Sequence, residues 1–219
     1  MPLATNEFER ITELQSLAAL PELTFAGLPA AMTLEAFRTA HCDLLGAGVP
    51  YWAVAWPGGQ ALARFLLDNP DRVVGRQVID IGCGAGLVAA AAMRAGAAGA
   101  TALDHDPNAV LAAAQTARLN DVEVAAQLAT IEGLAEELEA ARDTIVCAGD
   151  LWYEPETGRR ATTALTGLAA QGTEVYCGDP GRPGRPRTGV KELARYTISV
   201  APEFATGRSV RACVFALLP

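Results

Sequence analysis

Short apolar runs and longer amphipathic segments alternate along most of this chain. From Gln77 onward each apolar run has the length of a buried β-strand, and the segments between runs have helical spacing. This alternation predicts an α/β fold, a seven-stranded and mostly parallel sheet with helices on both faces. The predicted strands are residues 77–81, 100–103, 122–126, 144–148 and 174–177, followed by an antiparallel pair near 196–200 and 210–217. The predicted helices between them are residues 87–95, 107–119, 134–141 and 155–170.

The first 48 residues lack this alternation and are predicted to form an N-terminal helical extension, with the main domain spanning residues 49–219. One helix is predicted to be capped by Thr5 and to end by Pro21. Its apolar positions at helical spacing are Phe8, Ile11, Leu14 and Leu17. A second helix is predicted over residues 34–45. We expect the extension to cap the core; covering a binding site and forming a dimer contact are the alternatives.

Composition narrows the classes of protein that fit this pattern. The 219 residues are 51% hydrophobic, which is enough for one well-buried core. A net charge of −8 and a pI of about 4.8 argue against general binding to nucleic acid or to anionic membranes. The five scattered cysteines include no C-x-x-C pair, and the first residues are charged where an export signal would be apolar. We therefore expect a cytoplasmic protein with reduced thiols and no membrane span.

The run Asp80-Ile81-Gly82-Cys83-Gly84-Ala85-Gly86 joins the first predicted strand of the main domain to an Ala-rich helix. Glycines at alternate positions let the backbone turn tightly and let a ligand approach the main chain. The spacing is G-x-G-x-G, whereas the dinucleotide fingerprint needs a third glycine where Leu87 stands. The Asp80 carboxylate would also repel a pyrophosphate and favour a ligand that carries an ammonium group. A glycine-rich turn without a ligand is the alternative.

Two further acids follow predicted strands. Asp104 ends the next apolar run, 22 residues after Gly82, where an acid can accept hydrogen bonds from both hydroxyls of a ribose. Asp150 follows the fourth predicted strand. In an open α/β sheet ligands bind beyond the carboxyl ends of strands where the strand order reverses, and the first and fourth strands flank that point. We therefore expect Asp150 near the reacting groups; a helix cap or loop acid is the alternative.

Aromatic and basic residues stand close to these acids in the sequence. Trp56 precedes Pro57-Gly58-Gly59 and a helix predicted over 60–67, where the glycines offer bare N–H groups. Trp152 and Tyr153 follow Asp150 after one residue; they either pack in the core or wall a narrow channel that admits a long amine. A basic cluster follows the fifth strand: Arg182, Arg185, Arg187 and Lys191. It is explained either by a solvated loop or by docking of an acidic partner or substrate carboxylate.

Arg182 is the best inward-facing candidate of that cluster, because Asp179-Pro180-Gly181 would turn it back toward the site. The two histidines, His41 and His105, have no further ligands at suitable spacing. No metal site is therefore predicted. No Ser-His-Asp or Cys-His arrangement is indicated either.

The glycine loop with Asp80 resembles the first motif of class I, seven-β-strand methyltransferases, which use S-adenosyl-L-methionine (SAM). Within that class the chain resembles the lysine methyltransferases of the electron-transfer flavoprotein β-subunit and their bacterial relatives, over about residues 50–200. The resemblance is carried by Pro50-Tyr51-Trp52-Ala53 with Trp56-Pro57-Gly58-Gly59-Gln60-Ala61-Leu62, by Gly149-Asp150 with Tyr153-Glu154, and by Gly178-Asp179-Pro180-Gly181-Arg182. The last strand departs from the family's Thr-Thr-Val-Trp-like ending and reads Arg211-Ala212-Cys213-Val214-Phe215.

The resemblance implies a Rossmann-like class I methyltransferase fold with SAM as cofactor and S-adenosyl-L-homocysteine as product. It implies SAM contacts from Trp56, Gly82, Gly84 and Asp104. The other expected cofactor contacts are Gly59, Asp80, Gly86 and Asp150. It also implies that residues 150–153 line the entrance for an acceptor lysine. Asp150 and Tyr153 are the catalytic candidates. The expected substrate contacts are Trp152, Tyr153, Glu154 and Arg182.

The expected reaction moves a methyl group from SAM to an amine nitrogen by in-line displacement. A lysine side chain of a protein, such as the electron-transfer flavoprotein β-subunit, is the first acceptor to consider. An N-methyltransferase for a small amine or heterocycle is the alternative, and a non-enzymatic SAM-binding domain is a third hypothesis. A lysine amine has a pKa near 10.4 and must lose its proton before it attacks. Asp150 could orient the amine, and either Asp150 or water could take that proton.

Overall fold

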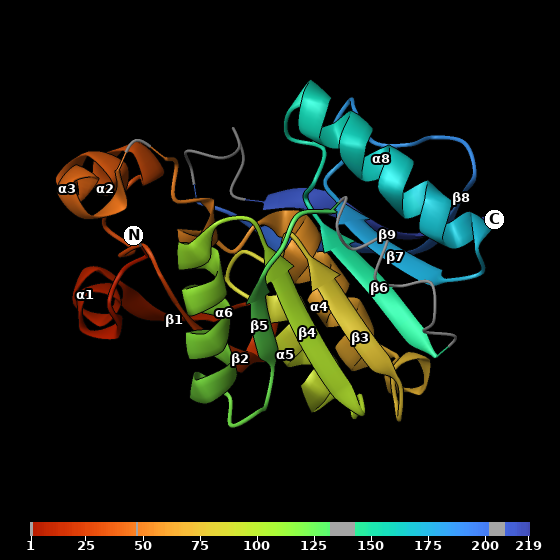
Figure 1. The fold of residues 1–219 in the computed structure, drawn as a ribbon, viewed down its shortest axis with the longest axis horizontal. Coiled ribbons are helices and arrows are strands. Elements are labelled where there is room, and N and C mark those ends of the chain that lie inside the picture. The colour runs from red at the N-terminus through yellow and green to blue at the C-terminus, as the bar shows by residue number, and fades with distance from the viewer. Residues whose placement is uncertain (1, 47, 132–142, 202–208) are drawn as a thin grey trace.

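The structure is a computed structural model that describes residues 2–46, 48–131, 143–201 and 209–219. A seven-stranded sheet with the order β5-β4-β3-β6-β7-β9-β8 lies at its centre (Figure 1). The strands are β3 (Gln77–Ile81), β4 (Gly99–Asp104), β5 (Ala125–Leu128), β6 (Thr144–Gly149), β7 (Glu174–Asp179), β8 (Val190–Ser199) and β9 (Ser209–Leu217). The first five are parallel, and β9 runs antiparallel to both β7 and β8. The predicted mostly parallel, seven-stranded sheet is confirmed.

Helices cover both faces of this sheet, as predicted (Figure 1). On one face lie α4 (Pro57–Asp68) and α5 (Leu87–Arg94), with α6 (Pro107–Leu119) beside β4 and β5. The opposite face is covered by α8 (Pro155–Ala170). The predicted bounds of α6 and α8 are confirmed, and α5 ends one residue earlier than expected. The helix predicted over residues 134–141 lies outside the described residues.

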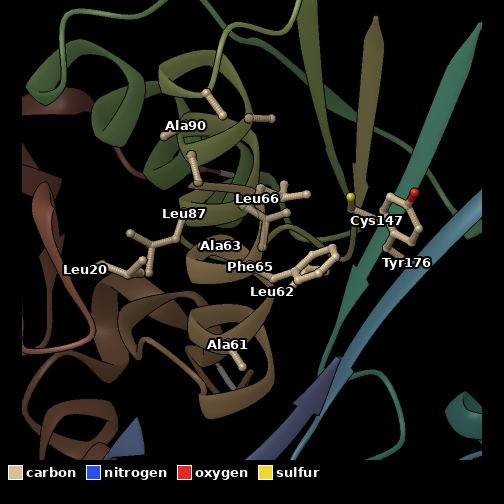
Figure 2. Packing of buried hydrophobic residues seen from close by; sticks show 14 of the residues in the cluster. Leu20, Ala61, Leu62, Ala63, Phe65, Leu66, Leu87, Ala90, Cys147 and Tyr176 are labelled. Atoms are coloured by element: carbon tan, nitrogen blue, oxygen red, sulfur yellow. The ribbon is translucent and has the colours of Figure 1, made fainter. Parts of the chain in front are cut away.

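The core is divided between the two faces because successive side chains of a strand point to opposite sides. Figure 2 shows Leu62 and Phe65 of α4 beside Cys147 of β6 and Tyr176 of β7. The Phe65 and Tyr176 ring centroids are 5.9 Å apart. On the other face Val146 packs under α8. A strand buried on both faces must be apolar throughout, which explains why β6 reads as an uninterrupted apolar run.

The N-terminal segment differs from the prediction. Its elements are α1 (Thr5–Ile11), β1 (Glu13–Leu17), β2 (Leu20–Gly27), α2 (Leu34–Ala40) and α3 (Cys42–Leu45). The first predicted helix therefore stops at Ile11, and β1 pairs with β2 in an antiparallel hairpin. Leu14, counted as a helical core position, is 63% exposed on β1.

The hairpin forms because β2 supplies a strand partner and carries apolar residues into the main core. Leu20, Leu23 and Phe25 are fully buried there with residues of α4 and α5. Such long-range pairing overrides a helical pattern that depends only on local spacing. The extension is thus helical only in part, and its boundary at residue 48 stays a prediction. The second predicted helix is capped by Thr33 but is interrupted at His41.

Other boundaries also differ from the prediction. β5 begins at Ala125, three residues later than expected, and ends at Leu128, two residues later; β8 begins six residues early at Val190. α4 begins at Pro57 instead of Gln60, with proline in the first helical position, which its fixed φ angle favours. The short 3₁₀ helices are η1 (Tyr51–Ala53) and η2 (Pro70–Arg72).

Within the described residues, no helix combines the length and apolar content needed to cross a bilayer.

Candidate functional site

A cavity of about 550 Å³ opens at the carboxyl ends of β3, β4 and β6. The chain turns to opposite sides of β3 when it continues into β4 and later into β6, so this is the point where the strand order reverses. The volume lies in the range of roughly 300–1,000 Å³ that is usual for sites of small ligands and cofactors. A smaller cleft of about 50 Å³ shares part of this lining and reaches Asp80. The residues common to both are Trp56, Gly82, Gly84, Gly149 and Asp150.

The three glycines of the loop after β3 all have left-handed backbone angles, with φ of +63° at Gly82, +50° at Gly84 and +74° at Gly86. Only glycine adopts this region without strain. Gly82 and Gly84 line the cavity, as predicted for residues that a ligand approaches. Gly86 does not line it, because a Cβ at Gly86 would lie 2.7 Å from the Cα of Ala113 in α6. Its predicted role as a cofactor contact is corrected to close packing of α5 against α6.

Asp104 at the end of β4 is buried and lines the cavity. Its Oδ2 accepts a hydrogen bond of 3.0 Å from the Gly84 N–H, and its Oδ1 accepts one of 3.0 Å from the Asp106 N–H. Nδ1 of His105 lies 3.3 Å from the same Oδ1. Each carboxylate oxygen can accept a second hydrogen bond, so Asp104 is held in place and still able to bind two hydroxyls.

Asp80, in β3, is only 2% exposed and lies beside the smaller cleft. Its Oδ2 accepts one hydrogen bond, of 3.2 Å, from the Ala89 N–H at the start of α5. Burial, helped by the nearby Asp104 charge and opposed by the Ala89 N–H, raises the pKa of Asp80 to about 8. The carboxyl is therefore uncharged at neutral pH in the free protein. A cation placed in the cleft would favour its ionised form.

Asp150 lies directly after β6 with an unusual backbone angle, φ of +59°. Its N–H donates to the Gly178 carbonyl at 2.9 Å, which ties it to the end of β7. Its Oδ1 forms an ion pair with Arg182, and its Oδ2 accepts a hydrogen bond of 2.8 Å from the Gly59 N–H. Burial raises the pKa of Asp150, whereas Arg182 and the Gly59 N–H act in the opposite direction. The Gly59 N–H, expected to be bare, thus donates to Asp150, while Gly59 itself lines the smaller cleft and its contact with a cofactor stays a prediction.

Glycines bring the start of α4 close to the ends of β6 and β7. A Cβ at Gly149 would lie 2.8 Å from the Cα of Gly59, and a Cβ at Gly58 would lie 2.6 Å from Oδ2 of Asp150. A Cβ at Gly178 would overlap the Gly58 backbone. These residues were noted in the sequence only as parts of motifs; their common purpose, a close backbone contact beside Asp150, needed the tertiary structure.

Three aromatic rings meet at the rim of the cavity. The Tyr51 ring lies 5.2 Å from that of Tyr153 and 5.9 Å from that of Trp56, measured between centroids. The Trp56 indole N–H donates to the Tyr51 carbonyl at 2.8 Å. Tyr51 and Tyr153 are each 40% exposed, and burial raises the pKa of Tyr153. Tyr51 was not selected as a site residue, although its position beside Trp52 and Trp56 was a signal that could have found it.

Trp152 does not wall the cavity, which corrects its predicted role as a substrate contact. It is 3% exposed, its ring packs 5.8 Å from that of Phe215, and its indole N–H donates to Oγ1 of Thr162 at 2.9 Å. Trp152 directs its side chain under α8, because the turn after Asp150 places neighbouring side chains on different sides. Tyr153 and Glu154 do line the cavity, and Glu154 is exposed at the start of α8.

We expect Trp152→Phe to lower the free energy of unfolding by about 1 kcal/mol, because the hydrogen bond to Thr162 is lost while most apolar packing is kept. Cofactor affinity should stay within about twofold, since the ring lies outside the cavity; the matched variant Trp56→Phe, at the rim, should weaken it more. Urea unfolding and calorimetric titration with SAM measure the two quantities. Loss of SAM binding in a folded Trp152→Phe protein would contradict this placement.

The basic cluster is split by the fold. Arg182 faces the cavity and pairs with Asp150, as expected for an inward position. Arg185 instead contacts β9, with its Nη1 3.2 Å from Sγ of Cys213 and its guanidinium 5.3 Å from the Phe215 ring centroid. Arg187 and Lys191 are exposed. No group of three or more His, Cys, Asp or Glu side chains that could hold a metal ion occurs in the part of the chain that the structure describes.

The segment after β5 also lines the cavity, with Ala129, Thr130 and Ile131. These residues were not predicted as site residues, because β5 was expected to end at residue 126 and ends at Leu128. With the strand end at Leu128, the rule that ligands bind beyond carboxyl strand ends would have found them.

Comparison with known proteins places this geometry in a class. The sequence profile of the family "Ribosomal protein L11 methyltransferase (PrmA)" matches residues 61–148. In solved structures, the chain is similar to the tRNA (uracil-54, C5)-methyltransferase of Pyrococcus abyssi in complex with S-adenosyl-L-homocysteine, with a TM-score of 0.56, 11% identity and coverage of 94% of this chain and 44% of that one. It is also similar to the magnesium protoporphyrin IX methyltransferase of Synechocystis PCC 6803 with bound SAH, with a TM-score of 0.50, 16% identity and coverage of 73% and 81%. Sheet order and helix layers thus define a class I, seven-β-strand methyltransferase fold, as predicted.

Within that class, the sequence is similar to the electron transfer flavoprotein beta subunit lysine methyltransferases. It is 38% identical to the Rattus norvegicus protein over 167 residues, which cover 74% of this chain and 64% of that protein. It is 40% identical to the Homo sapiens protein over 148 residues, which cover 67% and 55%. The resemblance drawn from the motifs is confirmed. The chain spans between half and two thirds of the length of these curated relatives.

Proposed function

We propose that this protein is a SAM-dependent N-methyltransferase that methylates lysine side chains of a protein substrate, with the electron-transfer flavoprotein β-subunit as the first candidate. The observation that carries the proposal is a single cavity that joins Asp104 and the glycine loop to Asp150. It occurs in a chain about 40% identical to proteins named as lysine methyltransferases of that subunit.

The residues present fit SAM. Asp104 has acceptor capacity for two ribose hydroxyls, and Gly82 and Gly84 leave the main chain open to a ligand. Asp80 beside the smaller cleft suits the ammonium group of the methionine end. Trp56 lines both the cavity and the cleft and can shield a sulfonium. When bound, SAM would supply an electrophilic methyl group.

The chain itself contributes positioning and electrostatics to the proposed reaction. Asp150 presents a fixed, buried carboxylate at the wall where the acceptor amine would enter. A preorganised negative group favours the positive charge that develops on the nitrogen during methyl transfer. Tyr51 and Tyr153 narrow the rim with apolar ring surface, which suits the aliphatic stem of a lysine.

The test uses SAM labelled in its methyl group. We would incubate it with the purified protein and either the purified electron-transfer flavoprotein β-subunit or a lysate from a source strain lacking the gene, and separate the products by size. Label in one protein band, mapped to a lysine by mass spectrometry, would support the proposal. Label only in small molecules would favour the small-amine alternative. The control is Asp104→Ala, which should abolish labelling because the ribose contact is lost.

We also propose a cytoplasmic location. All five cysteines are free thiols and four of them are buried, a state typical of reducing compartments. Fractionation of cells that express the tagged protein tests this, and recovery in an oxidising compartment would contradict it.

A further inference from the structure

Asp179 at the end of β7 shapes the loop that carries Arg182. Its side chain is fully buried, with 0% exposure. Its Oδ1 accepts hydrogen bonds of 2.6 Å from the Gly181 N–H and 2.7 Å from the Arg182 N–H. Its Oδ2 lies 3.4 Å from Nη1 of Arg182. One carboxylate therefore holds both the backbone and the guanidinium of Arg182.

The same Nη1 of Arg182 also pairs with Oδ1 of Asp150, so the guanidinium lies between two buried carboxylates. The other oxygen of Asp150 accepts the Gly59 N–H from α4. Asp150 is thus held from two sides by groups that are themselves fixed, one on the loop after β7 and one at the start of α4. A loop acid that serves only as a helix cap does not require its carboxylate to be fixed by two separate elements.

We propose that Asp179 and Arg182 are positioning residues that keep the Asp150 carboxylate ionised and aimed into the cavity, where Asp150 orients the acceptor amine. This inference rests on the proposed function. The amine loses its proton to water before the reaction. The nitrogen lone pair then forms a bond to the methyl carbon while the bond between that carbon and the sulfur of SAM breaks. The electron pair of the broken bond stays on sulfur. Asp150 stabilises the resulting cationic nitrogen.

Opposing effects act on the Asp150 carboxyl. Burial, with a smaller effect from Asp179, raises its pKa above the ordinary value, while Arg182 and the Gly59 N–H limit that rise. Removal of Arg182 would leave only the Gly59 N–H to oppose burial, so the pKa of Asp150 should rise. Among the described residues, the cavity is also lined by other titratable groups: Asp104 at the end of β4, His105 and Asp106 after it, Tyr51 in η1, and Tyr153, Glu154 and Arg160 beyond β6.

A titration that needs no acceptor tests the ion pair. The Gly59 amide donates to Asp150, so its ¹⁵N–¹H resonance should report the ionisation of that carboxylate. In Arg182→Gln the midpoint should move to higher pH by about one unit or more, because an opposite charge at this range shifts a pKa by roughly 1–3 units. Arg182→Lys should restore part of the shift. Arg195→Gln, which removes an exposed pair with Glu192 on β8, is the matched control and should leave the midpoint unchanged.

Methyl transfer to the β-subunit, followed against pH, tests the positioning role. Arg182→Gln should lower kcat about tenfold or more near neutral pH and move the acidic limb of the profile upward by the same amount as the Gly59 midpoint. Asp179→Asn should lower kcat with a smaller shift, because Arg182 keeps its charge but loses its anchor. KM for SAM should change little in either variant.

The outcomes separate this inference from the proposed function. An unchanged Gly59 midpoint in Arg182→Gln, or a wild-type pH profile with normal kcat, would overturn the inference while methyl transfer by the wild type stands. Failure of the wild type to transfer methyl groups would overturn the proposed function and with it the role assigned to Asp179 and Arg182, whatever the Gly59 titration shows. If Asp179→Asn does not fold, the two Arg182 variants decide alone.

Discussion

Raising the pH from about 4 to about 8 should cost the free protein several kcal/mol of stability through one carboxyl, and Asp80→Asn should remove that loss. The pKa of Asp80 is about 8 in the folded state against an ordinary value of 3.8. Between these values the folded state holds a proton that the unfolded state has released, so stability falls as pH rises and levels off above pH 8. The slope is about 1.4 kcal/mol per pH unit, or roughly 6 kcal/mol between the two pKa values.

Urea unfolding at pH 5, 6, 7 and 8 measures this dependence. Asp80→Asn keeps the shape of the side chain and should be more stable than the wild type at pH 8, with a flatter slope. SAM should flatten the wild-type slope as well, because an ammonium group beside Asp80 favours the charged carboxylate. Asp71→Asn, at an exposed position, is the control. Equal slopes in the wild type and Asp80→Asn would show that Asp80 is already ionised in the folded protein.

Asp150→Asn should lower the turnover of methyl transfer about 100- to 1,000-fold while SAM affinity stays within about threefold. The substitution removes the negative charge beside the nitrogen that becomes positive, and it keeps a side chain that can still accept the Gly59 N–H. Asparagine also tolerates the backbone angle of +59° at this position, which most residues adopt only with strain. Arg182 retains Asp179 as a partner, so the variant should fold.

Asp121→Asn is the matched control for this substitution. Asp121 is exposed and also has a left-handed backbone angle, φ of +52°, so it reports what the same chemical change does away from the cavity. Its turnover and SAM affinity should equal those of the wild type. Calorimetry with SAM and initial rates with labelled SAM measure both quantities. Near-normal turnover in Asp150→Asn would remove Asp150 from the chemistry.

The two predictions describe acids with opposite surroundings. Among the described residues, Asp80 accepts a hydrogen bond from the Ala89 N–H and forms no ion pair, so burial dominates and raises its pKa. Asp150 is as deeply buried but has Arg182 and the Gly59 N–H. Burying an acid costs stability, so two buried acids beside one cavity indicate a need for them in binding or chemistry.

The alternating pattern and the glycine loop were enough to predict the sheet, α6, α8 and the positions of Asp104 and Asp150 at strand ends. These features depend on side-chain period and on backbone freedom, which are local properties that a sequence displays directly. The rule that ligands bind beyond the carboxyl ends of strands then predicted that Asp104 and Asp150 lie at one site. The motifs supplied the resemblance to one methyltransferase family.

What only the tertiary structure decided depends on partners far away in the chain. Residues 13–17 became a strand because β2 offered backbone hydrogen bonds and a route into the core. Trp152 faces the core and Gly86 faces α6, because the direction of a side chain in a turn is set by what packs against it. The link from Asp179 through Arg182 to Asp150 joins residues 32 positions apart. Local spacing can nominate such residues, but only the folded chain shows which of them touch.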